Sequence, residues 1–398
     1  MNRSQAKILA AGSAALLIAS VLYAWSAFVP YVQKLNGWNA MQTSGIFTVA
    51  LWVVCLGQFL SDAVAKRLGA RAVIRTGAVF LALAFAVPGV FSGSLAAAYI
   101  GFGVFSGLGV GIVYNGILTA GLSWFRDKPG TCSGTLLMFY GFGSTVVSYL
   151  AHFLLENLTL RTALLILAAL EFAVLTAASA VVRENPAEAA AEKKSGETLP
   201  GVGVKRLLHM PIFYCQFFWM VVMCVSGLTA IGSATSVGLS LRMTPLAAVT
   251  MAGVLTCCNG LSRGVFGVLF DRLGSRKSML MITLLQAAGV AVSALSLASG
   301  SAWLLTAGFL MIGLGYGGCN SLNAALTEEL YGPAHFSQNL AVINLQCCFS
   351  SLLGPALGGA IYTASKSYLP AFFYLLAASA AAGLLMLCYF RLKRKVKT

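Results

Sequence analysis

The chain of 398 residues is too apolar for a soluble globular protein. Hydrophobic residues make up 59% and charged residues 9% of it, with a mean hydropathy of +0.85, whereas charged residues alone make up about 25% of an ordinary soluble domain. The formal net charge of +15 suits membrane insertion and contact with anionic lipid, and it gives little support to a nucleic-acid partner. The composition predicts an all-α integral membrane protein.

Twelve membrane-spanning helices are predicted in chain order. Most charge-free runs reach the ~20 residues that a span needs. Two of them, 76–125 and 278–327, are twice too long and contain Ser-Gly-Ser midway, so each predicts a helical hairpin. The first run is treated as a span because it lacks the cleavage site of a signal peptide. The charge-free runs are 8–33, 35–61, 76–125, 129–155, 207–241, 243–262, 278–327, 330–365 and 367–390, and the segment 162–182, interrupted only by Glu171, adds a further span. Span eight lies in the apolar stretch from Pro245 to Phe270, which contains Arg263.

The basic residues predict the orientation. Of the 26 Lys and Arg residues, 21 fall on the side of both termini, four fall on the other side, and Arg263 lies within a span. Because cytoplasmic loops collect Lys and Arg, we expect both termini in the cytoplasm and the protein in the inner (plasma) membrane.

An internal repeat divides the chain. The segment 66–71, KRLGAR, recurs as DRLGSR at 271–276, an offset of 205, and GLG at 107–109 recurs at 313–315, an offset of 206. The predicted domains are a six-helix bundle over 1–183, a cytoplasmic linker over 184–206, and a second six-helix bundle with a basic tail over 207–398. Two parallel repeats of this kind are typical of a transporter that rocks about a site between its halves.

Arg263 is the most informative single residue. At ~1.5 Å per helical residue it lies roughly 12 Å from Asp271, too deep for easy snorkelling in a hydrocarbon core of ~30 Å. A charge at that depth usually faces a bundle interior or a water-filled cavity and marks a substrate path. The alternative is a structural arginine that carbonyl groups or a buried acid neutralise.

The loop motif around Asp271 resembles that of a known superfamily. The segment Gly267-x-x-x-Asp271-Arg272-x-Gly274-x-Arg276-Lys277 is similar to the loop motif of the major facilitator superfamily, and a degenerate copy starts at Asp62. The resemblance implies twelve helices in two pseudo-symmetric six-helix bundles. It also implies that Asp271, Arg272 and Arg276 gate the cytoplasmic side.

Further motifs resemble one branch of that superfamily. The segments GLGVGIVY at 107–114 and WFRDK at 124–128, Tyr23 and Trp25 in span one, and Arg263 in span eight are similar to the oxalate/formate antiporter family and its monocarboxylate-carrier relatives. Dicarboxylate-exchanging members pair the arginine with a lysine in span eleven, where this chain has Cys347. Proton-coupled relatives place an aspartate four residues before the arginine, where it has Asn259. The resemblance therefore implies a monocarboxylate substrate such as formate, lactate or pyruvate, and it gives no proton-coupling pair.

Polar residues in other spans complete the predicted site. Asn259 lies on the Arg263 face of its helix, and Asn344 and Cys347 share a face of span eleven. The predicted substrate-binding residues are Arg263, Asn259, Tyr114, Tyr23, Tyr316, Asn320, Asn344 and Cys347. The alternative for each aromatic or amide is that it only holds helices together. Glu171, deep within span six, is either a proton carrier or a neutral hydrogen-bonded acid.

The sequence does not suggest that the protein is an enzyme. It contains no phosphate-binding loop, no His-rich metal set and no nucleophile placed beside a His base, so no catalytic residue, cofactor or metal is predicted. The expected partners are a small organic anion and membrane lipid, and the expected state is a monomer. Two alternatives stay open: an efflux pump for another solute, and a non-transporting membrane sensor of a carboxylate.

Overall fold

The structure is a computed structural model that describes residues 3–186 and 201–396. Nearly all of these residues are helical, and neither range contains a β-strand. Most of the predicted linker, 187–200, lies outside the described residues. The chain divides into two compact units, each described by itself.

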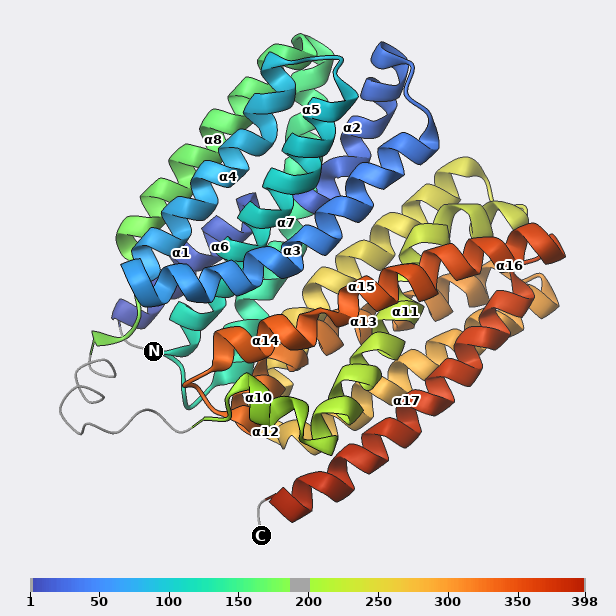
Figure 1. Cartoon of the computed structure of the whole chain (residues 1–398). Coiled ribbons are helices and arrows are strands. Elements are labelled where there is room, and N and C mark those ends of the chain that lie inside the picture. The colour runs from blue at the N-terminus through green and yellow to red at the C-terminus, as the bar shows by residue number, and fades with distance from the viewer. Residues whose placement is uncertain (1–2, 187–200, 397–398) are drawn as a thin grey trace. The chain divides into compact units, whose positions relative to one another are not determined.

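Unit 1 comprises Met1–Asp127, Thr135–Gly201 and Tyr331–Asn344. Within it α4 lies beside α8 and α3 lies beside α6 (Figure 1). Its helices are α1 (Arg3–Ile18), α2 (Val21–Asn36), α3 (Ala40–Leu68), α4 (Ala70–Val90), α5 (Leu95–Ala98), the π-helix η1 (Tyr99–Phe105), α6 (Ser106–Leu122), most of α7 (Pro129–Asn157), α8 (Leu160–Val181) and α14 (Phe336–Asn344).

Unit 2 comprises Lys128–Gly134, Val202–Leu330 and Leu345–Thr398. In it α17 packs along both α11 and α12. Its helices are α10 (Val204–Leu208), α11 (Pro211–Ser240), α12 (Pro245–Ser299), most of α13 (Ala302–Tyr331), α15 (Gln346–Ser351), the π-helix η2 (Leu352–Ala356), α16 (Leu357–Ser365) and α17 (Leu369–Val396). The π-helix falls at the Gly-Pro pair, where proline withholds a backbone donor.

The twelve predicted spans all have helical counterparts among the described residues. Ten stretches are long and apolar enough to cross a membrane. One of them, α12, has 55 residues and a non-helical Gly274, so it contains spans eight and nine. The first predicted span is not continuous: a break at Ala19 and Ser20 separates α1 from α2, each of 16 residues. There the Ser20 hydroxyl donates to the Leu17 carbonyl, which competes with helical bonding.

Capping residues determine where several spans begin. Asn39 and Gln42 form a reciprocal capping box at the start of α3. Thr244 caps α12, and Pro245 follows at the first helical position, where its missing N–H costs nothing. These caps satisfy backbone donors that have no partner within the helix.

The internal repeat is visible in the backbone. Gly69 has φ 80° and ψ 168°, and Gly274, 205 residues later, has φ 78° and ψ 167°. The helix crossings repeat as well: a Cβ on Gly107 would lie 2.7 Å from the Ala50 carbonyl oxygen, and one on Gly313 would lie 2.7 Å from that of Leu255. The α3–α6 pair and the α12–α13 pair are therefore two copies of one packing arrangement.

Each unit also contains one segment from the other half of the sequence. Segment 128–134, the start of predicted span five, belongs to unit 2, and segment 331–344, the first part of predicted span eleven, belongs to unit 1. The two segments occupy equivalent places in the repeat, since 128 and 334 differ by the same offset of 206.

Candidate functional site

One stripe on α12 carries the predicted arginine and the predicted gate. Asn259, Arg263, Gly267 and Asp271 follow one another at intervals of four residues, so they lie on the same helix face. Arg263 is 5% exposed and Asn259 is 7% exposed. Three residues of the predicted site and gate, Asn259, Arg263 and Asp271, are thus arranged along a single helical face.

The Arg263 guanidinium has a thiol neighbour on α11. It lies within electrostatic range of the Cys224 thiol of α11. That thiol shares hydrogen bonds with Cys319 of α13 and Gln346 of α15, and the Gln346 amide also contacts the sulfur of Cys347. Cys347 is therefore linked to Cys224 through the Gln346 side chain.

Asn259 is held against α13 by its backbone. Gly317 packs on the Asn259 carbonyl so closely that a Cβ at Gly317 would collide with it. The Ser262 hydroxyl donates to the same carbonyl at 3.1 Å. The side-chain oxygen Oδ1 of Asn259 is buried and accepts no hydrogen bond from a described residue. The Asn259 backbone is therefore fixed, while its side-chain oxygen has no donor among the described residues.

Tyr316 and Asn320 lie on α13 in the same unit. The Tyr316 ring packs on Gly227 of α11, where only a glycine leaves room for it. The Asn320 amide donates to the Tyr316 carbonyl at 2.9 Å, so it stabilises its own helix. Tyr316 is 5% exposed, and Asn320 is half-buried.

Asp271 accepts hydrogen bonds from the first turn of α7. Its two carboxylate oxygens receive the backbone N–H groups of Gly130 at 2.8 Å and Thr131 at 2.5 Å. These N–H groups have no partner inside their own helix, and the helix dipole favours a negative charge there. Gly134 packs against Gly267 and the Arg263 carbonyl. Segment 128–134 therefore covers the α12 stripe from Asp271 to Arg263.

The other predicted gating residues point to the helix surface. Arg272 and Arg276 are exposed. The Arg276 guanidinium lies 5.9 Å from the centre of the Phe390 ring, a cation–π contact with α17. Close by, Lys393 of α17 donates to Ser275 and to Glu329 at 2.7 Å each. The end of α17 is thus fastened to the loop motif.

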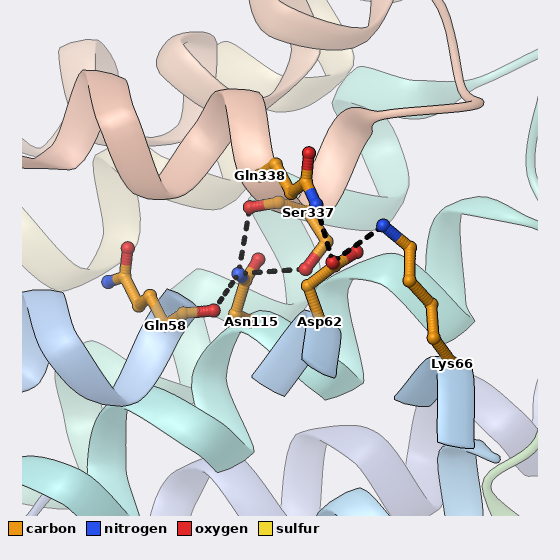
Figure 2. A network of polar contacts seen from close by, with 6 residues as sticks. All are labelled: Gln58, Asp62, Lys66, Asn115, Ser337 and Gln338. Carbon is orange, nitrogen blue, oxygen red and sulfur yellow. Dashed lines mark hydrogen bonds and ion pairs between the residues drawn. The ribbon is translucent and has the colours of Figure 1, made fainter. Parts of the chain in front are cut away.

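A network of polar contacts fastens α14 to α3 and α6 in unit 1 (Figure 2). The Asn115 amide, wholly buried on α6, donates to the Gln58 carbonyl, the Ser337 carbonyl and the Ser337 hydroxyl at 3.0–3.1 Å. Asp62 accepts from Gln338 at 2.7 Å and pairs with Lys66 at 2.8 Å. The N-terminal part of α14 is therefore held by hydrogen bonds rather than by apolar packing alone.

A cavity of about 280 Å³ opens beside this network within unit 1. Asp62, Lys66 and Ser337 line it together with Arg126, Glu184 and Asn185. Its lining contains two acidic residues, Asp62 and Glu184, and two basic residues, Lys66 and Arg126.

Asn344 joins the same network. Its amide donates to the Gln58 side-chain oxygen at 3.0 Å, and the Cys55 thiol contacts its carbonyl at 3.7 Å. Asn344 belongs to unit 1 and Cys347 to unit 2, although the two are only three positions apart in the sequence. The arrangement therefore assigns these two predicted site residues to different surroundings.

Tyr114 and Tyr23 are the two tyrosines predicted for the site in the first half of the chain. Tyr114 of α6 meets Tyr140 of α7 edge to face, with ring centres 5.4 Å apart. Tyr23 lies on α2, but its side chain is outside the described residues. Glu171 of α8 is 2% exposed, and its Oε2 makes no hydrogen bond to a described residue.

Sequence reasoning missed Gln58. It lies 11 residues before Gly69, as Arg263 lies 11 residues before Gly274, and it is 4% exposed. Gln58 is therefore the repeat counterpart of Arg263. Counting back from the two glycines would have found it, whereas Cys224 and Gln346 carry no sequence signal that distinguishes them from packing residues.

Comparisons with known proteins agree with this architecture. A family model described as Major Facilitator Superfamily matches residues 10–349 and 233–398. An uncharacterised MFS-type transporter of Escherichia coli (strain K12) is 25% identical over 303 residues, 74% of this chain and 73% of that protein. The oxalate:formate antiporter of Oxalobacter formigenes is 23% identical over 358 residues, 87% of this chain and 82% of that protein.

Two further similarities extend over most of the chain. Monocarboxylate transporter 13 of Rattus norvegicus is 24% identical over 353 residues, 87% of this chain and 79% of that protein. The crystal structure of a bacterial homologue of ferroportin superposes with a TM-score of 0.74 at 15% identity, covering 98% of this chain and 99% of that one, which shows a shared fold. The chain therefore belongs to the major facilitator superfamily, a family of membrane transporters and not of enzymes.

Proposed function

We propose that this protein is a secondary active transporter that moves a small organic anion and binds it on Arg263. The observation that carries the proposal is the burial of this guanidinium, which is 5% exposed on a membrane-spanning helix and lies near the Cys224 thiol. A buried cation is costly unless it has a function or a partner. The anion that best suits the planar guanidinium is a carboxylate, because it can accept two parallel hydrogen bonds from it.

A monocarboxylate such as formate, lactate or pyruvate is the proposed substrate. Two relatives of similar coverage are named an oxalate:formate antiporter and a monocarboxylate transporter. Arg263 is the one basic residue inside the predicted spans. Cys347 stands where dicarboxylate exchangers of the resembling family have a lysine. A second carboxylate would have no cation to offset the cost of its desolvation.

The proposed cycle is alternating access, as an antiporter or a proton symporter. The bundles over 1–183 and 207–398 rock about the linker at 184–206, and Asp271, Arg272 and Arg276 gate the cytoplasmic side. The Asp271 bonds to the first turn of α7 support a gate that forms and breaks as a unit. We place the protein in the inner (plasma) membrane as a monomer with both termini cytoplasmic.

The remaining predicted site residues complete the proposed binding set. Asn259 and Tyr316 lie in unit 2 with Arg263, as do Asn320 and Cys347. Tyr114, Tyr23 and Asn344 belong to unit 1. We propose that both groups contact the anion during the cycle.

A thermal-shift screen with purified protein tests the binding step. Formate, acetate, lactate, pyruvate and oxalate are compared on wild type and on Arg263→Gln, because a ligand that binds only the folded state raises the melting temperature. We expect monocarboxylates to stabilise wild type and none to stabilise the variant. A variant that responds as wild type does would remove Arg263 from the site.

Counterflow in liposomes tests transport itself. Preloaded carboxylate should accelerate uptake of labelled carboxylate by wild type and not by Arg263→Gln. Binding without flux would favour the membrane sensor. No response to any acid would favour an efflux pump for another solute.

A further inference from the structure

A second cavity, of about 160 Å³, lies within unit 2 between the second half of α11, α16 and the start of α17. Thr229 of α11 lines it. This residue is five positions beyond Cys224, the thiol near Arg263, which corresponds to roughly 8 Å along the helix. No residue of the predicted site or gate lines the cavity, so the proposed function does not use it.

One part of the lining offers a hydrogen-bond acceptor. Ser233 of α11 donates its own proton to the Thr229 carbonyl at 2.7 Å, so its oxygen keeps lone pairs that can accept. It is half-buried. The two neighbouring hydroxyls suit this role less well. Thr229 is 5% exposed and packs against Gly354, and Ser236 is exposed, so that water competes for it.

Another part of the lining is aromatic. Tyr362 of α16 and Tyr368, which precedes α17, stack with ring centres 4.1 Å apart and an angle of 18° between their planes. Phe372 of α17 adds a third ring. Aromatic rings pack favourably against one another, beyond the burial of area alone. The cavity therefore suits a ligand that contains a ring.

Charge and volume restrict that ligand further. None of the described residues that line the cavity is charged. An ionised ligand would lose its hydration there without a counter-charge, so a neutral molecule is favoured. A cavity of about 150 Å³ is large enough for one benzene molecule. A volume of about 160 Å³ thus suits a single six-membered ring with a small polar group.

We propose that this cavity binds a small neutral aromatic alcohol of the phenol type. The ring packs against Tyr362 and Phe372, and the hydroxyl donates to the oxygen of Ser233. The ligand thereby contacts α11, α16 and α17 together. This inference goes beyond the proposed function, because it uses none of the residues assigned to the anion.

Phenol and toluene provide the decisive comparison, because a hydroxyl and a methyl group are similar in size and only the hydroxyl donates a hydrogen bond. Dissociation constants are measured by calorimetric titration of the purified protein, with a detergent blank. A single hydrogen bond to a neutral group corresponds to about tenfold in affinity. We expect wild type to bind phenol about tenfold more tightly than toluene.

Two serine variants test the acceptor. Ser233→Ala should lose the preference for phenol while its toluene affinity stays as in wild type. Ser236→Ala removes a hydroxyl from the same cavity and the same helix, and it should keep the preference. Equal preferences in Ser233→Ala and wild type would overturn the role of Ser233.

Two glycine variants test the place of binding. A Cβ on Gly359 or on Gly383 meets no atom within 4 Å, but only Gly359 lines the cavity. We expect Gly359→Leu to fill the cavity and abolish phenol binding, and Gly383→Leu to bind as wild type does. If Gly359→Leu does not fold, the serine variants remain the test.

The outcomes also separate this cavity from the anion site. Arg263→Gln should bind phenol as wild type does, and a loss of phenol binding in that variant would overturn the inference by assigning phenol to the anion site. Wild type that binds phenol and toluene equally, or Gly359→Leu that folds and still binds phenol, would overturn it as well.

Discussion

The carboxylate of Asp271 accepts a hydrogen bond of 2.8 Å from the backbone N–H of Gly130. The two residues are 141 positions apart in the sequence, and the bond ties the end of the Arg263 stripe to the first turn of α7. Because Gly134 packs on the Arg263 carbonyl, this anchor and the proposed anion site share one short segment of chain.

Removing the charge of Asp271 should release that segment. Asp271→Asn keeps one acceptor oxygen but loses the ionic part of two hydrogen bonds, which costs about 1–3 kcal/mol. We expect a lower melting temperature in detergent. Asp127→Asn, at an exposed acid close to the same segment, should melt as wild type does. Equal melting of the two variants would contradict the anchor.

Adding a methyl group at Gly134 should displace the α12 backbone at Arg263 and so disturb the proposed site. A Cβ there would lie 2.6 Å from the Arg263 carbonyl oxygen and 2.8 Å from the Cα of Gly267. Such overpacking typically costs about 1–3 kcal/mol. We expect Gly134→Ala to melt earlier and to bind carboxylate more weakly than wild type.

Gly253→Ala is the control for that substitution. It lies on α12, and a Cβ there has no neighbour within 4 Å. Alanine in an open helical position is favourable by about 1 kcal/mol relative to glycine. A melting temperature at or above that of wild type is expected, with normal binding. A loss equal to that of Gly134→Ala would show that helix flexibility, and not packing, is what matters.

Replacing Arg263 by lysine should weaken the proposed site without abolishing it. Lysine keeps the charge but cannot form two parallel hydrogen bonds to one carboxylate, and such pairing contributes about 1–2 kcal/mol. We expect a dissociation constant about tenfold or more above that of wild type. Unchanged carboxylate affinity in Arg263→Lys would indicate that the site recognises the negative charge of the ligand and not its hydrogen-bond geometry.

A second cation should admit dicarboxylates. Cys347→Lys places an ammonium in the neighbourhood of Gln346 and Cys224, where wild type has only a neutral thiol. An added buried charge is costly until an anion pairs with it, so oxalate should stabilise Cys347→Lys more than it stabilises wild type. Cys347→Ser is the neutral control and should not respond to oxalate.

Glu171 should tolerate conversion to its neutral isostere. Its Oε2 is buried without a partner among the described residues, and an unpaired carboxylate is costly to bury, so we expect the neutral acid. Glu171→Gln should then melt and transport as wild type does, measured by uptake into liposomes with and without a proton gradient. Loss of proton-dependent uptake alone would instead identify Glu171 as a proton carrier.

Span positions and the repeat could be read from the sequence because the membrane imposes a length and a polarity on each helix. The two Ser-Gly-Ser turns end α4 and α12 where they were expected. Gly69 and Gly274 share an unusual backbone conformation that a common loop motif predicts. The break at Ala19 and Ser20 was not predicted; Gly143 of α7, which is more than 100 positions away in the sequence, packs against the Leu17 carbonyl and Ser20 there.

Pairings between distant residues depended on the tertiary structure. Nothing in the local sequence indicates that Gln58 receives the Asn344 amide, that Asp271 receives the start of α7, or that Asn115 holds Ser337. Such hydrogen bonds form between residues that only the packing of whole helices brings within 3 Å or so. Periodicity places a side chain on a face, but it does not identify which helix that face meets.

By itself, the sequence determined a twelve-span member of its superfamily with one buried arginine, because burial of apolar helices and the cost of a charge in a membrane are local properties of the chain. Only the tertiary structure decided three features near that arginine: the Cys224 thiol, an Asn259 side-chain oxygen without a donor among the described residues, and a segment of α7 that covers the stripe. Those features arise from contacts between helices that are far apart in the sequence. The free energy of such contacts cannot be derived from any single segment.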